Sequence, residues 1–248
     1  MSLLSSVAAS TSAKAETNYL GGYTPLESRL YDFTIDLAFL NLADSGACCL
    51  NIHMTSDEGK KLKQQFYISS GNDKGNRNYF IDKNGEEAHL PGFNQANALC
   101  LLTAGKEVLS CATENKVVSL YDFAERQEVP TKVEMLTELL GKKITAGVLK
   151  QTVNKSEKDP KTKKYVATAE TKVENEVDKF FRHRDGLTVP EIRAGITTPD
   201  FKTDWAEKWT GVIKDKTKAV VGIKAGIQAG APAAAMPSGA AAPQLLFA

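Results

Sequence analysis

The fold is decided by the stretch KKLKQQFYI, residues 60–68, in which apolar and polar side chains alternate. Successive side chains of a β-strand point to opposite faces, so this stretch predicts a half-buried strand. We expect Leu62, Phe66 and Ile68 to face a core. The side chains expected on the opposite, exposed face are those of Lys61, Lys63, Gln65 and Tyr67. The strand therefore combines a core-forming side with a basic and aromatic surface.

Two further strands are predicted before this stretch and two after it. Residues 31–39 and 48–54 show the same alternation, and turns rich in Asp and Gly separate these three strands. Residues 143–153 and 165–181 are rich in Val, Thr and Ala and predict a later pair of strands. A strongly hydrophilic turn over 154–164 is expected to join that pair.

The region between the third and fourth strands has a different pattern. Residues 69–92 contain turn residues throughout and predict a long loop or hairpin. Residues 93–102 have helical spacing, 117–129 form a mixed apolar segment, and 133–140 predict a short helix or turn. Five strands with a helix after the third is the order of an OB barrel, so we expect a mainly β fold with added helices, built on a five-stranded OB-fold barrel.

Four segments are expected along the chain. Residues 1–18 are small and polar and predict a flexible arm, followed by the OB-fold domain over 19–185. Residues 186–218 predict a helical extension, and 219–248 are a Gly/Ala/Pro-rich tail with an apolar tip. The N-terminal residues lack a basic start and a sustained apolar run, which favours a cytoplasmic protein with no membrane partner.

The helical extension carries two start signals and one apolar stripe. Thr188 and Glu191 have the spacing of a capping box, and Thr198 precedes a proline as a helix cap would. The aromatic stripe behind them is expected to pack on the domain itself and is not assigned to a binding site. Its members are Phe201, Trp205, Trp209 and Val212.

Charge is segregated along the chain although its total is nearly balanced. The net charge is +1, from 31 basic and 30 acidic residues. Residues 60–83 nevertheless carry +4 and residues 142–184 carry +6. Local distribution, and not the whole-chain balance, therefore indicates where a polyanion would bind.

Binding of single strands without sequence preference needs cations along the phosphates and aromatic faces for the bases. Two clusters supply both, although each is also compatible with an ordinary solvated surface. The first cluster comprises Lys61, Lys63, Tyr67, Lys74, Arg77, Tyr79 and Phe80. The second comprises Lys150, Lys155, Lys164, Tyr165 and Arg182.

An enzymatic function has weaker support. Glu170 and Lys172 form an acidic-x-Lys strand like that of magnesium-dependent nucleases, with Asp159 upstream as a metal ligand. Such triplets are common in charged strands, and no phosphate-binding loop, nucleophile elbow or zinc-protease helix is present. The histidines are scattered and the cysteines lack ligand spacing, so we expect reduced thiols, no catalytic residue, no metal and no cofactor. The cysteines are Cys48, Cys49, Cys100 and Cys111.

Several short motifs occur in a fixed order between residues 19 and 191. They are Tyr31–Ile35, Lys60–Ile68, Ser70–Gly75, Tyr79–Gly85, Leu90–Phe93, Leu139–Lys142 and Phe180–Phe181. In this order they resemble the OB-fold single-stranded-DNA-binding proteins of tailed bacteriophages. The resemblance implies a noncatalytic protein that coats and protects single strands during phage replication, recombination and repair in the bacterial cytoplasm. The alternatives are a phage nuclease, a strand-annealing recombination protein, or an adaptor that never touches DNA.

The tail departs from the pattern of that family. Many members carry an acidic tail with a terminal Phe, which recruits replication proteins and competes with DNA. Here no acidic residue follows Asp215. The apolar tip remains a candidate docking peptide for replication or recombination proteins, and it consists of Gln244, Leu245, Leu246 and Phe247.

Overall fold

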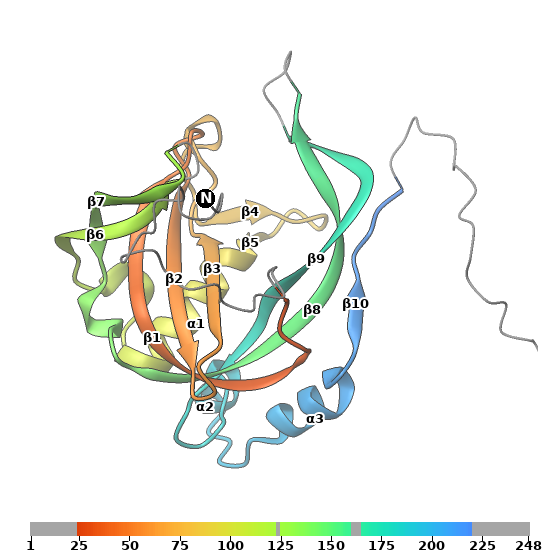
Figure 1. The fold of residues 1–248 in the computed structure, drawn as a ribbon. Coiled ribbons are helices and arrows are strands. Elements are labelled where there is room, and N and C mark those ends of the chain that lie inside the picture. Colours follow the sequence, from red (N-terminus) through yellow and green to blue (C-terminus); the bar gives the residue numbers. More distant parts are fainter. Residues whose placement is uncertain (1–23, 123–124, 160–164, 220–248) are drawn as a thin grey trace, which may run out of the picture.

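The computed structural model describes residues 24–122, 125–159 and 165–219, and the protein is mainly β (Figure 1). The predicted N-terminal arm, and the tail beyond Ala219, lie outside these residues. The strands are β1 (Arg29–Leu42), β2 (Cys48–Ser56), β3 (Lys61–Tyr67), β4 (Tyr79–Ile81), β5 (Glu87–His89), β6 (Glu114–Asp122), β7 (Gln127–Met135), β8 (Lys143–Lys158), β9 (Tyr165–Phe181) and β10 (Ile213–Asp215). The α-helices are α1 (Pro91–Ala104), α2 (Val189–Arg193) and α3 (Asp200–Trp209).

One antiparallel sheet organises the molecule, with β1 near its centre. β1 pairs with β2 on one side and with β8 on the other, while β3 extends the sheet beyond β2 and β9 extends it beyond β8. All five predicted strands are therefore confirmed. Within the described residues no backbone ladder joins β3 to β9, so the sheet is open.

A side chain crosses the opening between β3 and β9. The Val177 amide donates to Gln64 Oε1 over 3.0 Å, and Gln64 Nε2 donates to the Asn175 carbonyl over 3.2 Å. The amide of Gln64 thus satisfies one donor and one acceptor of β9, as a peptide group of a neighbouring strand would. The two edges of the open sheet consequently lie next to each other.

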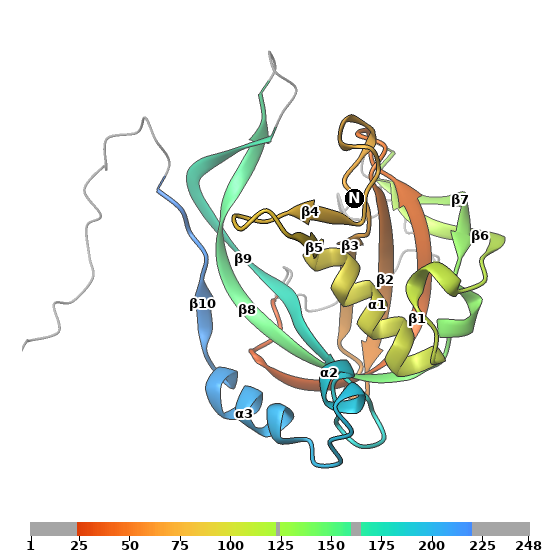
Figure 2. The ribbon, with the colours of Figure 1, turned by 180° about the vertical axis from the view of Figure 1, so that it is seen from behind.

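The core lies between the concave side of the sheet and α1. The alternation predicted for β3 is confirmed, because Leu62 and Phe66 are buried while Lys61, Lys63 and Tyr67 are exposed. α1 lies against this side, as Figure 2 shows, and ends at Gly105. The largest fully buried side chains include Phe33, Ile35, Leu50, Ile52, Leu99 and Phe180.

The prediction for residues 117–140 is wrong in part. The mixed apolar segment 117–129 lies in the β6–β7 hairpin, and Val133 and Met135 belong to β7 and not to a helix. β7 pairs with β1 through Met135 and Phe39, and these residues form a small core of their own. Only a short 3-10 turn, η4 (Thr137–Leu139), remains of the expected helix.

The region after β9 supports the end of the sheet. The capping box of Thr188 and Glu191 is confirmed, whereas α3 begins after Pro199 without a side-chain cap. Trp205 is buried beside Phe181, and a Cβ on Gly147 would lie 2.7 Å from its ring, so close packing of α3 on β8 requires glycine there. β10, which the sequence did not predict, runs parallel to β8. In the described part of the chain, no helix is long and apolar enough to cross a membrane.

Candidate functional site

A hollow of about 820 Å³ opens at the end of the molecule where the β1–β2 turn and the outer end of the β8–β9 hairpin lie. We call it the main groove. It is formed by five separate segments: the β1–β2 turn, the end of β3, the loop after β3, the start of α1 and the β8–β9 hairpin. Its lining residues are Asn41, Leu42, Ala43, Asp44, Ser45, Ala47, Gln65, Tyr67, Ser69, Ser70, Lys74, Leu90, Pro91, Gly92, Lys158 and Tyr165.

Two tyrosines line the main groove from different strands. Tyr67 ends β3 and its residue is 46% exposed, while Tyr165 begins β9 and is 72% exposed. Both rings are therefore accessible to a ligand, and an aromatic face is what an unpaired base stacks on. Leu42, which is 70% exposed, adds apolar surface to the same hollow.

A row of neutral polar side chains runs across the sheet beside Tyr67. Gln65 Nε2 donates to Asn51 Oδ1 over 3.2 Å and to Cys49 Sγ over 3.0 Å, and the Cys49 thiol lies 2.7 Å from Asn41 Oδ1. Burial raises the pKa of the Cys49 thiol, although the hydrogen bonds from Gln65 and Asn51 oppose this. Asn41 and Gln65, the members of the row that line the groove, therefore offer uncharged donors and acceptors to a ligand there.

The cations of the main groove are Lys74 and Lys158. Lys74 lies in the 3-10 turn η2 (Asn72–Lys74), and the Asn72 amide donates to the Ser45 carbonyl over 2.9 Å. Gly71 has φ +86°, and a Cβ there would lie 2.8 Å from that carbonyl, so the loop can dock on the β1–β2 turn only with glycine at this position. Lys158 Nζ lies 3.8 Å from Asp44 Oδ2, an exposed and weak pair.

Lys61 and Lys63 line a different hollow. It has a volume of about 410 Å³ and lies between β2, β3 and the β6–β7 hairpin, with His53 and Tyr121 also in its lining. Burial lowers the pKa of His53, and Lys63 lowers it further, which favours the neutral imidazole. Because outward-facing residues alternate along β3, the row from Lys61 to Tyr67 extends about 20 Å and connects this hollow with the main groove.

Other predicted binding residues lie outside both hollows. Arg77, Tyr79 and Phe80 belong to the separate β4–β5 sheet and the loop before it, where the Arg77 guanidinium lies 5.6 Å from the Tyr79 ring centre. Lys150 donates to Glu27 over 2.7 Å. Lys155 pairs with Glu170 over 2.8 Å on the outer part of the hairpin. The predicted residues Lys164, Gln244, Leu245, Leu246 and Phe247 lie outside the described residues.

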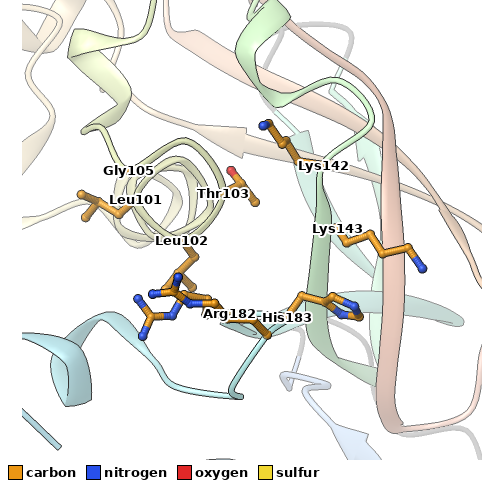
Figure 3. Close-up of a pocket in the computed structure, with 9 residues that line it drawn as sticks. Leu101, Leu102, Thr103, Gly105, Lys142, Lys143, Arg182 and His183 are labelled. Atoms are coloured by element: carbon orange, nitrogen blue, oxygen red, sulfur yellow. The ribbon is translucent and has the colours of Figure 1, made fainter. Parts of the chain in front are cut away.

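Arg182 lies at the other end of the molecule from Tyr165. β9 has 17 residues, so its two ends are about 55 Å apart along the strand. Arg182 lines a hollow of about 410 Å³ together with Lys142, Lys143 and His183, shown in Figure 3. The second predicted cluster is therefore divided between the two ends of the molecule.

The metal-site alternative centres on Glu170, whose carboxylate pairs with Lys155; hydrogen bonding to that ammonium lowers the pKa of the carboxyl. Among residues 24–122, 125–159 and 165–219, no three His, Cys, Asp or Glu side chains are grouped to hold a metal ion.

Sequence reasoning did not assign Leu42 or Gln65 to the site. Gln65 shares the exposed face of β3 with Tyr67, so its signal was present in the sequence. Lys158 belongs to the basic run before β9 from which the second predicted cluster was drawn. Leu42 becomes part of the groove only because the β1–β2 turn folds beside β3, which no local pattern reveals.

Comparison with known proteins adds no relative to this picture. No protein-family model matches the sequence, and no curated protein matches it. The candidate site therefore rests on the geometry of this chain.

Proposed function

We propose that the protein binds single-stranded DNA, without sequence preference and without catalysis, in the main groove. The observation that carries the proposal is that Tyr67, Lys74, Lys158 and Tyr165, from three separate segments, line one open hollow. Aromatic faces and cations are the two components that such binding requires, and each stacked base contributes about 1–3 kcal/mol. The setting that we propose, phage DNA replication, recombination and repair, follows from the motif order.

The fold supports the same proposal. The strands neighbour one another in the order β3, β2, β1, β8, β9, and in the chain α1 lies between β3 and β8. This arrangement matches the one expected of an OB barrel. We propose that the sheet is an OB barrel whose last edge is joined by Gln64 instead of by a backbone ladder. OB folds bind oligonucleotides on strands 2 and 3 and on the flanking loops, which correspond to the walls of the main groove.

A fluorescence titration with oligo(dT) at several salt concentrations tests the proposal. We expect saturable binding whose affinity falls as salt rises, because phosphate contacts release counterions. We expect a comparable affinity for mixed-sequence single strands and weaker binding to duplex. Absence of salt-sensitive binding would contradict the proposed function.

The double variant Tyr67→Leu/Tyr165→Leu locates the binding site. Loss of two stacking faces is expected to weaken binding by at least about 30-fold, from about 1 kcal/mol or more for each ring. Phe201→Leu is the matched control, because Phe201 is 43% exposed but lies on α3, away from the groove. Equal affinities for the double variant and the control would move the site elsewhere.

A further inference from the structure

Five basic side chains gather at the end of the molecule opposite the main groove. They surround the hollow of about 410 Å³ between the last turn of α1, the start of β8 and the turn after β9 (Figure 3). We call it the basal hollow. In the described part of the chain no acidic residue lines it. The basic side chains are Lys142, Lys143, Arg182, His183 and Arg184.

Carboxylates outside the lining lie within 3.3 Å of three of these five side chains, and Asp32 Oδ1 lies 3.3 Å from His183 Nδ1. Arg182 donates from Nε and Nη2 to the two oxygens of Asp185, over 2.9 and 2.6 Å. Lys143 Nζ lies 3.1 Å from Asp57 Oδ1. These pairs fix the positions of the cations but also neutralise part of their charge.

Lys142 and Arg184 are less compensated. Among the described residues no carboxylate forms an ion pair with Lys142, and the side chain of Arg184 is 74% exposed, with Asp185 3.5 Å from its Nε. In Figure 3, Lys142 lies on one side of the hollow and Arg182 and His183 on the other. An anion in the hollow would therefore be approached by cations from two sides.

The backbone around the arginines is preorganised. The Gly186 amide donates to the Arg182 carbonyl over 2.7 Å, and the Arg182 amide donates to the Leu187 carbonyl over 2.8 Å. Gly186 has φ +78°, a conformation that glycine adopts without strain. The turn thus presents Arg182 and Arg184 without needing to order on binding, which favours affinity.

We propose that the basal hollow is a second phosphate-binding site, which holds the backbone of a single strand after it leaves the main groove. Guanidinium groups bind phosphate oxygens with paired hydrogen bonds, and lysines add charge. The hollow is open to solvent, so a continuous chain can cross it. The nature of the ligand, a polynucleotide, rests on the proposed function; the phosphate chemistry rests on the hollow itself.

The length of β8 sets the number of nucleotides that a single-stranded DNA needs to reach both hollows. β8 runs from Lys143 at the basal hollow to Lys158 at the main groove, a path of about 50 Å at about 3.3 Å per residue. At about 3.4 Å per nucleotide of a stacked strand, about 15 nucleotides connect the two hollows. A short oligonucleotide can fill the main groove without reaching the basal hollow, whereas a long one reaches both.

The test compares a six-nucleotide and a thirty-nucleotide oligo(dT) on the full chain and on Lys142→Glu/Arg184→Glu. For the long strand, we expect affinity to fall about tenfold or more. The slope of log affinity against log salt should fall by about 1.4, since each lost contact with a single strand contributes about 0.7. For the short strand, affinity and slope should not change.

Lys132→Glu/Lys208→Glu is the matched control, since it alters net charge equally at two exposed residues that line neither hollow. The proposal is overturned if long-strand binding by the hollow variant equals that of the control. It is also overturned if the short strand loses as much affinity as the long one, because that result indicates a general field effect or a folding defect.

A titration with inorganic pyrophosphate, followed by backbone amide NMR, separates this proposal from the proposed function. We expect chemical-shift changes at Lys142, Lys143 and Arg182 in the unaltered chain. We expect none in the hollow variant, Lys142→Glu/Arg184→Glu. If these shifts occur but no oligonucleotide binds, single-strand binding fails and the hollow remains a phosphate site. If oligonucleotides bind the hollow variant normally and no shifts occur, the second site fails and the main groove stands.

Discussion

The two sides of the main groove are held in different ways. On one side, Tyr67 ends a strand that pairs with β2 along its whole length, and its neighbour Phe66 lies in the core. On the other side, Lys158 and Tyr165 face each other across the outer end of the β8–β9 hairpin. There, residues 155–158 and 165–167 are all exposed.

One wall of the groove, at Tyr67, is therefore part of the folded core. The other wall is the outer part of the β8–β9 hairpin, which we call the arm, and it is held by the hydrogen bonds between β8 and β9. Changes on the Tyr67 side should affect stability and binding together. Changes on the arm should affect binding alone, because exposed positions contribute little to the free energy of folding. The predictions below test this separation, from the largest expected effect to the smallest.

Replacement of Phe66 should have the largest effect. Phe66 is 6% exposed and meets Phe180 edge to face at 5.9 Å, so Phe66→Ala should lower the free energy of unfolding by about 3–5 kcal/mol. Val166→Ala, on the arm and 52% exposed, should change it by less than about 0.5 kcal/mol. Denaturant unfolding measures both values. Similar losses in the two variants would remove the distinction between wall and arm.

Gly92→Ala should have an intermediate effect on the free energy of unfolding. Whether the substitution raises or lowers that free energy tests the contact between α1 and β3. Alanine normally stabilises a helix relative to glycine by about 0.5–1 kcal/mol. Here a Cβ would lie 2.4 Å from the Tyr67 carbonyl oxygen and 2.8 Å from its amide nitrogen. We therefore expect a loss of about 1–3 kcal/mol and several-fold weaker binding of oligo(dT), because α1 and the end of β3 must separate. A gain in stability would show that this contact does not hold the wall.

The smallest effect concerns pH. Burial opposes ionisation of Glu191, but hydrogen bonds from Thr188 and from the Phe201 amide outweigh it and lower the pKa of the carboxyl. A folded-state pKa below the unfolded value of about 4.3 means that the carboxylate stabilises the fold above that pH. This contribution disappears as pH falls through the folded-state pKa. Glu191→Gln should therefore cost about 0.5–1 kcal/mol at pH 7 and reduce the loss of stability on acidification.

Glu170 on the arm provides the comparison for that experiment. Its hydrogen bond with Lys155 lowers the pKa of the carboxyl, but both side chains are exposed and solvent screens the pair. Glu170→Gln should leave the acid part of the stability profile, measured by thermal unfolding between pH 7 and about pH 3, unchanged. A profile flattened by Glu170→Gln, and not by Glu191→Gln, would contradict this assignment.

The strands with a buried face were predictable from sequence, and the others were not. β1, β2 and β3 alternate clearly because each has one side in the core. In β6 and β7 only Val133 and Met135, at one end, are buried, so these residues lack the core-facing pattern of a strand and were predicted as a mixed apolar segment and a short helix or turn. β10 has three residues and forms because β8 offers an edge beside it, which is information from a distant part of the chain.

The candidate site was predictable where exposed residues belong to one strand face, and less so where distant segments meet. Tyr67 and Lys74 were predicted in one cluster and Tyr165 in another, and the structure places all three around one hollow. Arg182 was grouped with Tyr165, because both flank the same predicted strand. They lie at opposite ends of that strand, which has 17 residues. The sequence alone did not show that these two ends border different hollows.

The Gln64 bridge has a consequence for inheritance. The hydrogen bonds of a backbone ladder use N–H and C=O groups that every residue except proline carries. A change in a single codon therefore seldom removes them. The two hydrogen bonds between β3 and the backbone of β9 instead depend on one side chain, and a single-nucleotide change from glutamine to leucine at position 64 abolishes both. One mutation can therefore remove or restore the hydrogen bonds between the two edges of the sheet.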